Sequence, residues 1–154
     1  MNLRTLRPSR RPPRPGDVFA LGLPDGTFLF GRVIRTDANP LGVGRGVLIY
    51  VYHSRTSTRD AVPELSPDSL LIPPLITNRL PWSRGYFEFV EHRPLTPRDQ
   101  LPAHSFRNSQ GLCFDEFGRR IPDAIGAVGE WGLHSYRSID DAISKAIGIP
   151  LSAE

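Results

Sequence analysis

The side chains that most often carry chemistry are few in this chain, which has four histidines and one cysteine among its 154 residues. Zinc and di-metal sites usually take two or more ligands from one short stretch, and no two of these histidines are spaced that closely. Distant histidines and carboxylates could still meet in space to hold a metal, but isolated histidines in a strand-rich domain are more often structural or exposed. We therefore expect no metal and no cofactor. The histidines are His53, His92, His104 and His134.

A cysteine nucleophile is the next chemistry to consider, because the members of a catalytic triad need to meet only in space. Cys113 could combine with His134 as the base and with Asp115 as the group that orients the base. The neighbours of this cysteine are Leu112 and Phe114, and in such apolar surroundings a cysteine behaves as a small buried hydrophobe. We expect Cys113 to belong to the core.

Two pairs of carboxylates could supply a general acid and a general base: Glu88 with Glu91, and Asp115 with Glu116. A solvated strand face explains such pairs equally well. The sequence thus predicts no catalytic residue and a protein that is not an enzyme. A hydrolase whose site has no recognisable motif is the last of the alternatives.

The segment 77–87 is the best candidate for recognition of another molecule. It gathers arginine, tryptophan and tyrosine side chains around a proline–glycine connection, and these residue types are enriched at the energetic centres of protein interfaces. The same side chains could stack on nucleic-acid bases. Alternatively, Trp82 could fold back to cover one end of the domain, since tryptophan is highly buried on average. The predicted partner-binding residues are Arg79, Trp82, Arg84, Tyr86, Glu88 and Glu91.

Short strands must position this segment, and the clearest of them form a β-hairpin at residues 16–34. Pro24, Asp25 and Gly26 are a turn signal in which the glycine supplies the positive φ of a tight turn. After the turn, side chains alternate with a period of two, as on a strand with two different faces.

The other strands are predicted from apolar runs and from alternation. Residues 46–53 form a continuous apolar and aromatic run, typical of a central strand buried on both faces. Residues 69–72 and 75–77 flank a Pro-Pro pair, which favours an edge strand or a crossing between sheets. Residues 85–91 alternate cleanly. The weaker strand candidates are residues 112–115 and 131–134, and long loops are expected at residues 94–111 and 117–130.

One helix is predicted, at residues 138–147. Ser138 is a good N-cap, and Asp140 and Asp141 would follow in the first turn, at the positive end of the helix dipole. Gly148 would end the helix. An apolar stripe at helical spacing would face the core and consists of Ile139, Ala142, Ile143, Ala146 and Ile147.

These elements predict an α+β fold: a mainly antiparallel, strongly bent sheet or a small, partly open barrel, with one C-terminal helix. Residues 1–15 hold five arginines and no acid, and their composition cannot bury apolar surface, so we predict a disordered Arg/Pro-rich leader. A single domain would follow at residues 16–154. Of the 19 basic residues 14 lie in this domain, against 16 acidic ones, so its formal charge is −2.

Composition also bears on the compartment. No apolar run reaches the roughly 18–20 residues that a membrane-spanning helix needs, and no apolar stretch follows the N-terminal arginines as it does in a secretory signal. A single cysteine excludes an internal disulfide and suits a reducing compartment. We therefore expect a cytoplasmic protein without a membrane partner.

Two segments of the chain resemble the immunity protein 26 family, and together they cover about residues 14–95. The first is Gly16-Asp17-Val18-Phe19, followed by Asp25-Gly26 and Phe30-Gly31-Arg32-Val33. The second is Asn78-Arg79-Leu80-Pro81-Trp82, followed by Gly85-Tyr86-Phe87.

The resemblance implies a bacterial cytoplasmic protein of a polymorphic toxin system, which protects its cell by binding a toxin domain encoded beside it. Some relatives carry a phosphotriesterase label, but this chain has no His-x-His metal pair, so that activity is not expected. No catalytic residues are carried over from the family. The first hypothesis is thus a non-enzymatic immunity protein whose partner is a cognate toxin. The alternative is a small β-barrel protein that binds nucleic acid through its basic N-terminal tail.

Overall fold

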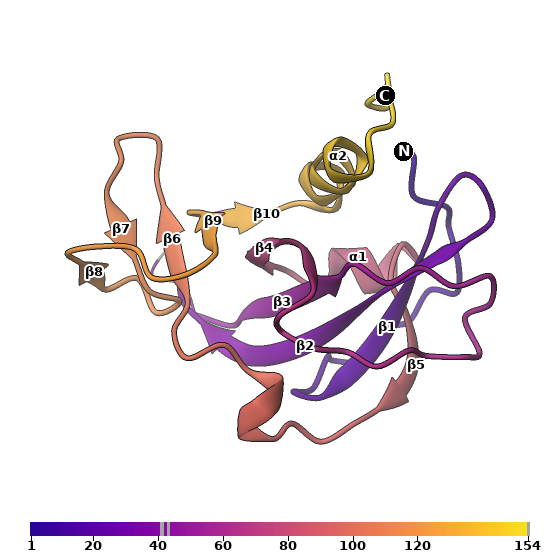
Figure 1. Cartoon of the computed structure of the whole chain (residues 1–154), viewed down its shortest axis with the longest axis horizontal. Coiled ribbons are helices and arrows are strands. Elements are labelled where there is room, and N and C mark those ends of the chain that lie inside the picture. The colour runs from indigo at the N-terminus through magenta and orange to yellow at the C-terminus, as the bar shows by residue number, and fades with distance from the viewer. Residues whose placement is uncertain (41, 43, 154) are drawn as a thin grey trace.

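A computed structural model describes residues 1–40, 42 and 44–153. These residues form two sheets, and the C-terminal helix α2 lies across one face of the larger sheet (Figure 1). None of the described helices has the length and the apolar character that crossing a bilayer requires. The elements are β1 (Asp17–Gly22), β2 (Phe28–Ala38), β3 (Gly46–Tyr52), β4 (Leu70–Thr77), α1 (Leu80–Ser83), β5 (Glu88–His92), the 3-10 helix η1 (Pro97–Asp99), β6 (Ser105–Arg107), β7 (Cys113–Phe114), β8 (Arg120–Ile121), β9 (Val128–Glu130), β10 (Leu133–His134) and α2 (Tyr136–Ile147).

The larger sheet has the strand order β10-β4-β3-β2-β1-β5, and the smaller one has the order β8-β7-β6-β9. Pairing is antiparallel except where β10 joins β4 and β9 joins β6. The predicted α+β class, with mainly antiparallel strands and a C-terminal helix, is confirmed. The expected strong bend or partly open barrel is not supported, since neither sheet is closed or strongly curled. In a barrel the two edge strands would pair with each other. Here the edge strand β5 pairs with β1 and the edge strand β10 pairs with β4.

The predicted hairpin is present as β1 and β2. Its tight turn contains Gly26 at a φ of 89°, as the turn signal requires. Phe19 stands opposite Gly31 in the register, and a Cβ atom at Gly31 would clash with the Phe19 ring. The glycine therefore lets an aromatic ring lie flat against the neighbouring strand.

The prolines of β4 produce a different structure from the one expected. Residues 70–77 form one continuous strand, and its register against β3 shifts between Ile49 and Val51, opposite the Pro73–Pro74 pair. A proline has no N–H to donate, so the ladder is interrupted there without ending the strand. Further short strands (β6, β8 and β9) and η1 lie within segments that were expected to be long loops.

Helix α2 begins at Tyr136, two residues before the predicted start. Ser135 is the N-cap, and its side chain accepts a hydrogen bond from the N–H of Ser138. Asp140 and Asp141 therefore lie beyond the first turn, and Asp140 is buried. Gly148 ends the helix in the left-handed conformation, as predicted.

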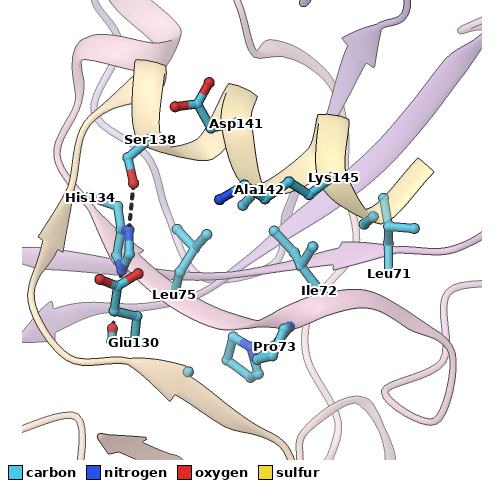
Figure 2. Close-up of a pocket in the computed structure, with 13 residues that line it drawn as sticks. Leu71, Ile72, Pro73, Leu75, Glu130, His134, Ser138, Asp141, Ala142 and Lys145 are labelled. Carbon is cyan, nitrogen blue, oxygen red and sulfur yellow. Dashed lines mark hydrogen bonds between the residues drawn. The ribbon is translucent and has the colours of Figure 1, made fainter. Parts of the chain in front are cut away.

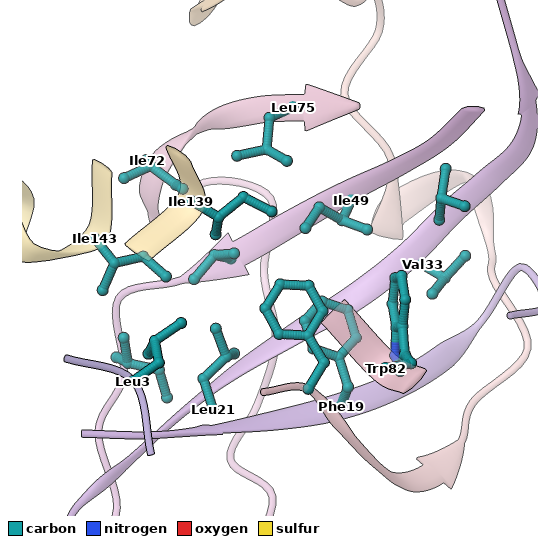
Figure 3. Packing of buried hydrophobic residues seen from close by; sticks show 14 of the residues in the cluster. Leu3, Phe19, Leu21, Val33, Ile49, Ile72, Leu75, Trp82, Ile139 and Ile143 are labelled. Carbon is teal, nitrogen blue, oxygen red and sulfur yellow. The ribbon is translucent and has the colours of Figure 1, made fainter. Parts of the chain in front are cut away.

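One face of the larger sheet carries a core of hydrocarbon and aromatic side chains (Figure 3). Ile139 and Ile143 of α2 pack on this face. Phe19 lies beneath α1 and stacks on Phe87, with ring centroids 4.4 Å apart. Leu3 from the start of the chain joins the same cluster and is 3% exposed.

Residues 1–15 run along the domain in the structure. The N–H groups of Arg4, Leu6 and Ser9 donate to the carbonyl groups of Gly22, Gly85 and Trp82, respectively. The backbone N–H groups of residues 2 and 3 donate to the buried carboxylate of Asp140, at 3.2 and 2.6 Å. The division into a disordered leader and a domain stays a prediction, and these contacts supply the means to test it.

Candidate partner-binding surface

Trp82, the tryptophan of the predicted partner-binding cluster, lies in the core and is 0% exposed. Its ring packs edge-on against Phe19 and Phe87, at centroid distances of 5.2 and 5.1 Å, and stacks on Phe89 at 5.7 Å. The structure therefore supports the alternative in which Trp82 folds back onto the domain. This side chain can affect binding by holding its segment in place and not by touching a partner.

A single helical turn, α1, orders the chain around Trp82. The side-chain oxygen of Asn78 accepts a hydrogen bond of 2.9 Å from the N–H of Leu80 at the start of the turn. Gly85 follows the turn with a φ of 83°, which reverses the chain toward β5. Arg79 and Arg84 occupy the two ends of α1, and both are exposed.

Tyr86 connects this segment to the C-terminal helix. Its ring stacks on the ring of Tyr136, with centroids 5.1 Å apart and an interplanar angle of 29°. Both tyrosines are half-buried, and Leu80 of α1 is 42% exposed. The "α1 surface" is defined here by Arg79, Leu80, Arg84, Tyr86 and Tyr136.

The arginines of the predicted cluster lack ion-pair partners within the described chain, whereas its glutamates have them. Arg79 and Arg84 form no ion pair or side-chain hydrogen bond with any residue that the structure describes. Glu88 accepts hydrogen bonds from the backbone of Arg7 and from the side chain of Arg59, each at 3.1 Å. Glu91 is paired with Arg93. Within the predicted cluster, the charge left without an ion pair is therefore positive.

The second carboxylate pair serves local structure. Oδ1 of Asp115 accepts hydrogen bonds from the backbone N–H groups of Phe117 and Arg119 and so shapes a turn. Glu116 accepts a 2.6 Å hydrogen bond from Nδ1 of His104. Burial is the largest influence and would raise the pKa of Glu116. The hydrogen bonds from His104 and from the Glu116 backbone N–H, together with the charges of His104 and Arg35, outweigh burial, so the pKa lies below its usual value. Neither carboxylate belongs to the α1 surface.

His104 is the centre of a buried polar network. Because Nδ1 faces the carboxylate of Glu116, this nitrogen carries the proton, and Nε2 accepts a 2.6 Å hydrogen bond from the hydroxyl of Tyr50. The Tyr50 oxygen in turn accepts from the N–H of Leu101 at 2.9 Å. Burial raises the pKa of Tyr50 to about 12. The network fastens the segment that leads into β6 onto β3, and its tyrosine is closed off from solvent.

A groove lies between α2 and β4, with a volume of about 660 Å³ (Figure 2). The side chains of Leu71, Ile72 and Leu75 form its apolar floor. Sequence reasoning did not find this groove, because its lining residues are spread from position 71 to position 146. The sequence did show polar side chains beside the apolar stripe of the helix. It did not show which other segment these polar side chains would face.

The catalytic triad that was weighed for Cys113 and not expected is not assembled by its candidate base. Both ring nitrogens of His134 already have other partners: Nδ1 lies 3.0 Å from the Ser138 hydroxyl, and Nε2 lies 3.1 Å from the Glu130 carbonyl oxygen. Cys113 is buried, as expected. Within the described residues no three histidine, cysteine or carboxylate side chains gather in a way that could hold a metal.

Arginines of the N-terminal segment are drawn into contacts with the domain. Arg11 donates to the buried Asp17 at 3.0 Å and lies over the ring of Phe89, 3.9 Å from its centroid. Arg14 also pairs with Asp17, at 3.6 Å. Arg4 lies over the ring of Phe28. These three guanidinium groups are therefore not presented together as a patch for phosphates.

The model of a protein family described as Immunity protein 26 matches residues 14–112. The match covers β1 to β6, which include all of the larger sheet except β10. Residues 113–154, which supply β7 to β10 and α2, lie outside it. No curated protein and no solved structure matches the chain.

Proposed function

Since the chain belongs to the immunity protein 26 family, we propose that it neutralises its cognate toxin in the cytoplasm without catalysis, by binding the toxin through the α1 surface. Family membership identifies an immunity protein of a polymorphic toxin system. The proposal adds the mode of action, which is occlusion of the toxin by a bound protein, and the surface that binds.

The observation that carries this choice is the pair of unpaired arginines at the two ends of α1. A charged side chain without an internal partner can form its ion pair with another molecule at little cost to the fold. The stacked tyrosines beside them offer rigid aromatic area, and arginine and tyrosine are common at the energetic centres of interfaces. We infer that the toxin presents an acidic patch to this surface.

The support beneath the α1 surface favours binding without rearrangement. Trp82 is locked between Phe19, Phe87 and Phe89, so the helical turn that carries both arginines rests on a packed aromatic floor. A surface held in one conformation loses little conformational entropy on binding. This is the property that an inhibitor acting by occlusion needs.

The test is growth rescue followed by measurement of affinity. The toxin domain encoded beside this gene is expressed with and without the protein, and the complex is then isolated and its Kd measured by calorimetry. We expect rescue, and we expect Arg79→Ala and Arg84→Ala each to weaken binding by more than about 1 kcal/mol, roughly fivefold in Kd. The matched control is Arg107→Ala, which removes an exposed arginine on β6.

Two results would count against the proposal. If the neighbouring domain is toxic and the protein gives no protection, the immunity function fails. If protection is found but Arg79→Glu/Arg84→Glu binds the toxin as well as Arg107→Ala does, the α1 surface is not the interface. Circular dichroism and urea unfolding of each variant separate loss of binding from loss of fold.

A further inference from the structure

We infer that the groove between α2 and β4, called here the α2 groove, takes an extended, basic segment of the toxin and sets which toxin the protein recognises. The inference rests on the proposed function, because the occupant is part of the same partner. It adds a second contact site, and it assigns a chemistry to that site's ligand: an apolar side chain next to a lysine or an arginine.

The floor of the α2 groove can receive an apolar side chain. Leu71, Ile72 and Leu75 of β4 line it, and the wall contributed by α2 opposite them includes Ala142 and Ala146. Such small side chains leave the space between helix and strand unfilled, and the resulting volume of about 660 Å³ has room for more than one side chain. Burial of an apolar group here removes its surface from water and stabilises the complex.

The rim of the α2 groove selects a positive charge beside that apolar group. Glu130 and Asp141 both line the groove, and neither carboxylate has an ion pair or a side-chain hydrogen bond within the part of the chain that the structure describes. Lys145 is the single lysine or arginine of the lining. Figure 2 shows Asp141 on the helix and Glu130 on the strand side of the opening, near His134. With two carboxylates and one lysine, the rim has a formal charge of −1.

The rim is held in place before any partner arrives. His134 connects Ser138 of α2 to the carbonyl of Glu130 through its two ring nitrogens, at 3.0 and 3.1 Å. Since a carbonyl oxygen can only accept, Nε2 carries the proton and Nδ1 accepts from the Ser138 hydroxyl. The carbonyl of His134 also accepts a 2.7 Å hydrogen bond from the hydroxyl of Thr77 in β4. One histidine thus ties the helix, β9 and β4 together around the groove.

The two sides of the α2 groove have different origins in the chain. The floor, at residues 71–75, lies within the region that matches the family, and the wall and rim, at residues 129–146, lie outside it. A scaffold common to the family thus meets a part that the family model does not describe. Contacts from this second part can help to separate one toxin from another, because specificity is a difference in affinity between partners.

The test uses the opposite charges of the rim. We expect Glu130→Gln/Asp141→Asn to weaken binding of the whole toxin domain roughly five- to tenfold, because a basic partner loses two attractive charges. Lys145→Gln should strengthen binding roughly two- to threefold, because it removes a repulsive one. The matched control is Glu64→Gln/Asp68→Asn, which neutralises two exposed carboxylates elsewhere on the surface and should leave Kd unchanged. Hydrogen exchange of the complex should protect a toxin segment that contains a lysine or an arginine next to an apolar residue.

Equal Kd values for all three variants would overturn the inference. So would stronger binding by Glu130→Gln/Asp141→Asn together with weaker binding by Lys145→Gln. If Arg79→Ala and Arg84→Ala still weaken binding in that case, the proposed function stands and the α2 groove alone is excluded as a contact. If the toxin binds none of the proteins, including the unaltered chain, both proposals fail together.

Discussion

The two faces of the larger sheet are buried in different ways. One face, called here the apolar face, is covered by α1, α2 and the start of the chain, and its core consists of aliphatic and aromatic side chains (Figure 3). The opposite face, called here the mixed face, packs against β6 and the loops around it, and it buries Tyr50 and Arg32 together with apolar residues. The first depends on contact area and packing. The second also depends on the hydrogen bonds and ion pairs that Tyr50 and Arg32 form.

The mixed face shows what this dependence requires. The guanidinium of Arg32 is almost fully buried; it lies 3.2 Å from the carboxylate of Asp99 and donates to the carbonyl of Arg93 at 2.6 Å. The hydroxyl of Tyr50 is fixed by His104, which is in turn fixed by Glu116. Removing one of these side chains leaves another polar group buried without a hydrogen-bond partner, and this lowers the free energy of unfolding. The comparison therefore predicts large, pH-independent effects on the apolar face and smaller, pH-dependent ones on the mixed face.

The largest effect should come from Trp82→Ala on the apolar face. The substitution removes a fully buried ring that contacts three other aromatic rings. We expect the free energy of unfolding to fall by about 3–5 kcal/mol, as for other large-to-small changes of buried aromatic residues. Urea unfolding at several pH values from about 3 to 7 measures the loss caused by the substitution, and this loss should be the same throughout.

The control for this prediction is Arg79→Ala, which changes an exposed neighbour on the same segment and should alter stability by less than about 0.5 kcal/mol. A loss of under 1 kcal/mol for Trp82→Ala would contradict the burial of the ring. It would restore Trp82 as a surface residue that is free to touch the toxin.

The larger sheet, whose strands supply both faces, is where the sequence was most informative about the fold. Alternation and a turn signal predicted the β1–β2 hairpin, and an apolar run predicted β3, because these patterns are local consequences of burial. The same reasoning placed the start of α2 at Ser138, since Ser135 and Ser138 are both acceptable N-caps. In the structure the side chain of Ser135 caps the helix. Contacts distant in sequence place Asp140 against the first residues of the chain.

The candidate site was less predictable from the sequence, because it depends on contacts between elements that are distant in the chain. Composition identified Arg79, Arg84 and Tyr86 as side chains suited to an interface, and all three lie on the α1 surface. It could not show that Glu88 is engaged by Arg59, or that Tyr136 stacks on Tyr86 from another element. The strands within 94–111 and 117–130 are two or three residues long, too short for a periodic pattern to reveal them.

The next largest effect should come from Leu3→Ala, which tests how the chain start contributes to the apolar face. Leu3 is buried in the same cluster as Ile143, and its N–H donates to the buried carboxylate of Asp140 at 2.6 Å. We expect a loss of about 2–4 kcal/mol, typical of removing a buried leucine side chain. The control Arg10→Ala alters an exposed residue of the same segment. No difference between the two variants would mean that residues 1–15 behave as the separate leader that their composition predicts.

The smallest of the three effects should come from Glu116→Gln on the mixed face, and it should depend on pH. A glutamine oxygen can still accept from Nδ1 of His104, so the variant keeps the hydrogen bond and loses its charge. A hydrogen bond to a charged group contributes more than a neutral one, and we expect a loss of about 1–2 kcal/mol at pH 7. The control is Glu64→Gln, which alters an exposed carboxylate and should have almost no effect.

The sign of the pH dependence follows from the lowered pKa of Glu116. A carboxyl group with a lower pKa in the folded state binds fewer protons there than in the unfolded chain, so its contribution is complete above the unfolded-state pKa, about 4.5. The contribution disappears as pH falls through the folded-state pKa. Unaltered protein and Glu116→Gln should therefore differ in stability at pH 7, and the difference should shrink as pH falls below about 4.5. Asp17, whose pKa is also lowered, keeps the variant partly sensitive to acid. If the difference is instead constant with pH, as on the apolar face, the charge of Glu116 contributes nothing and the two faces are stabilised alike.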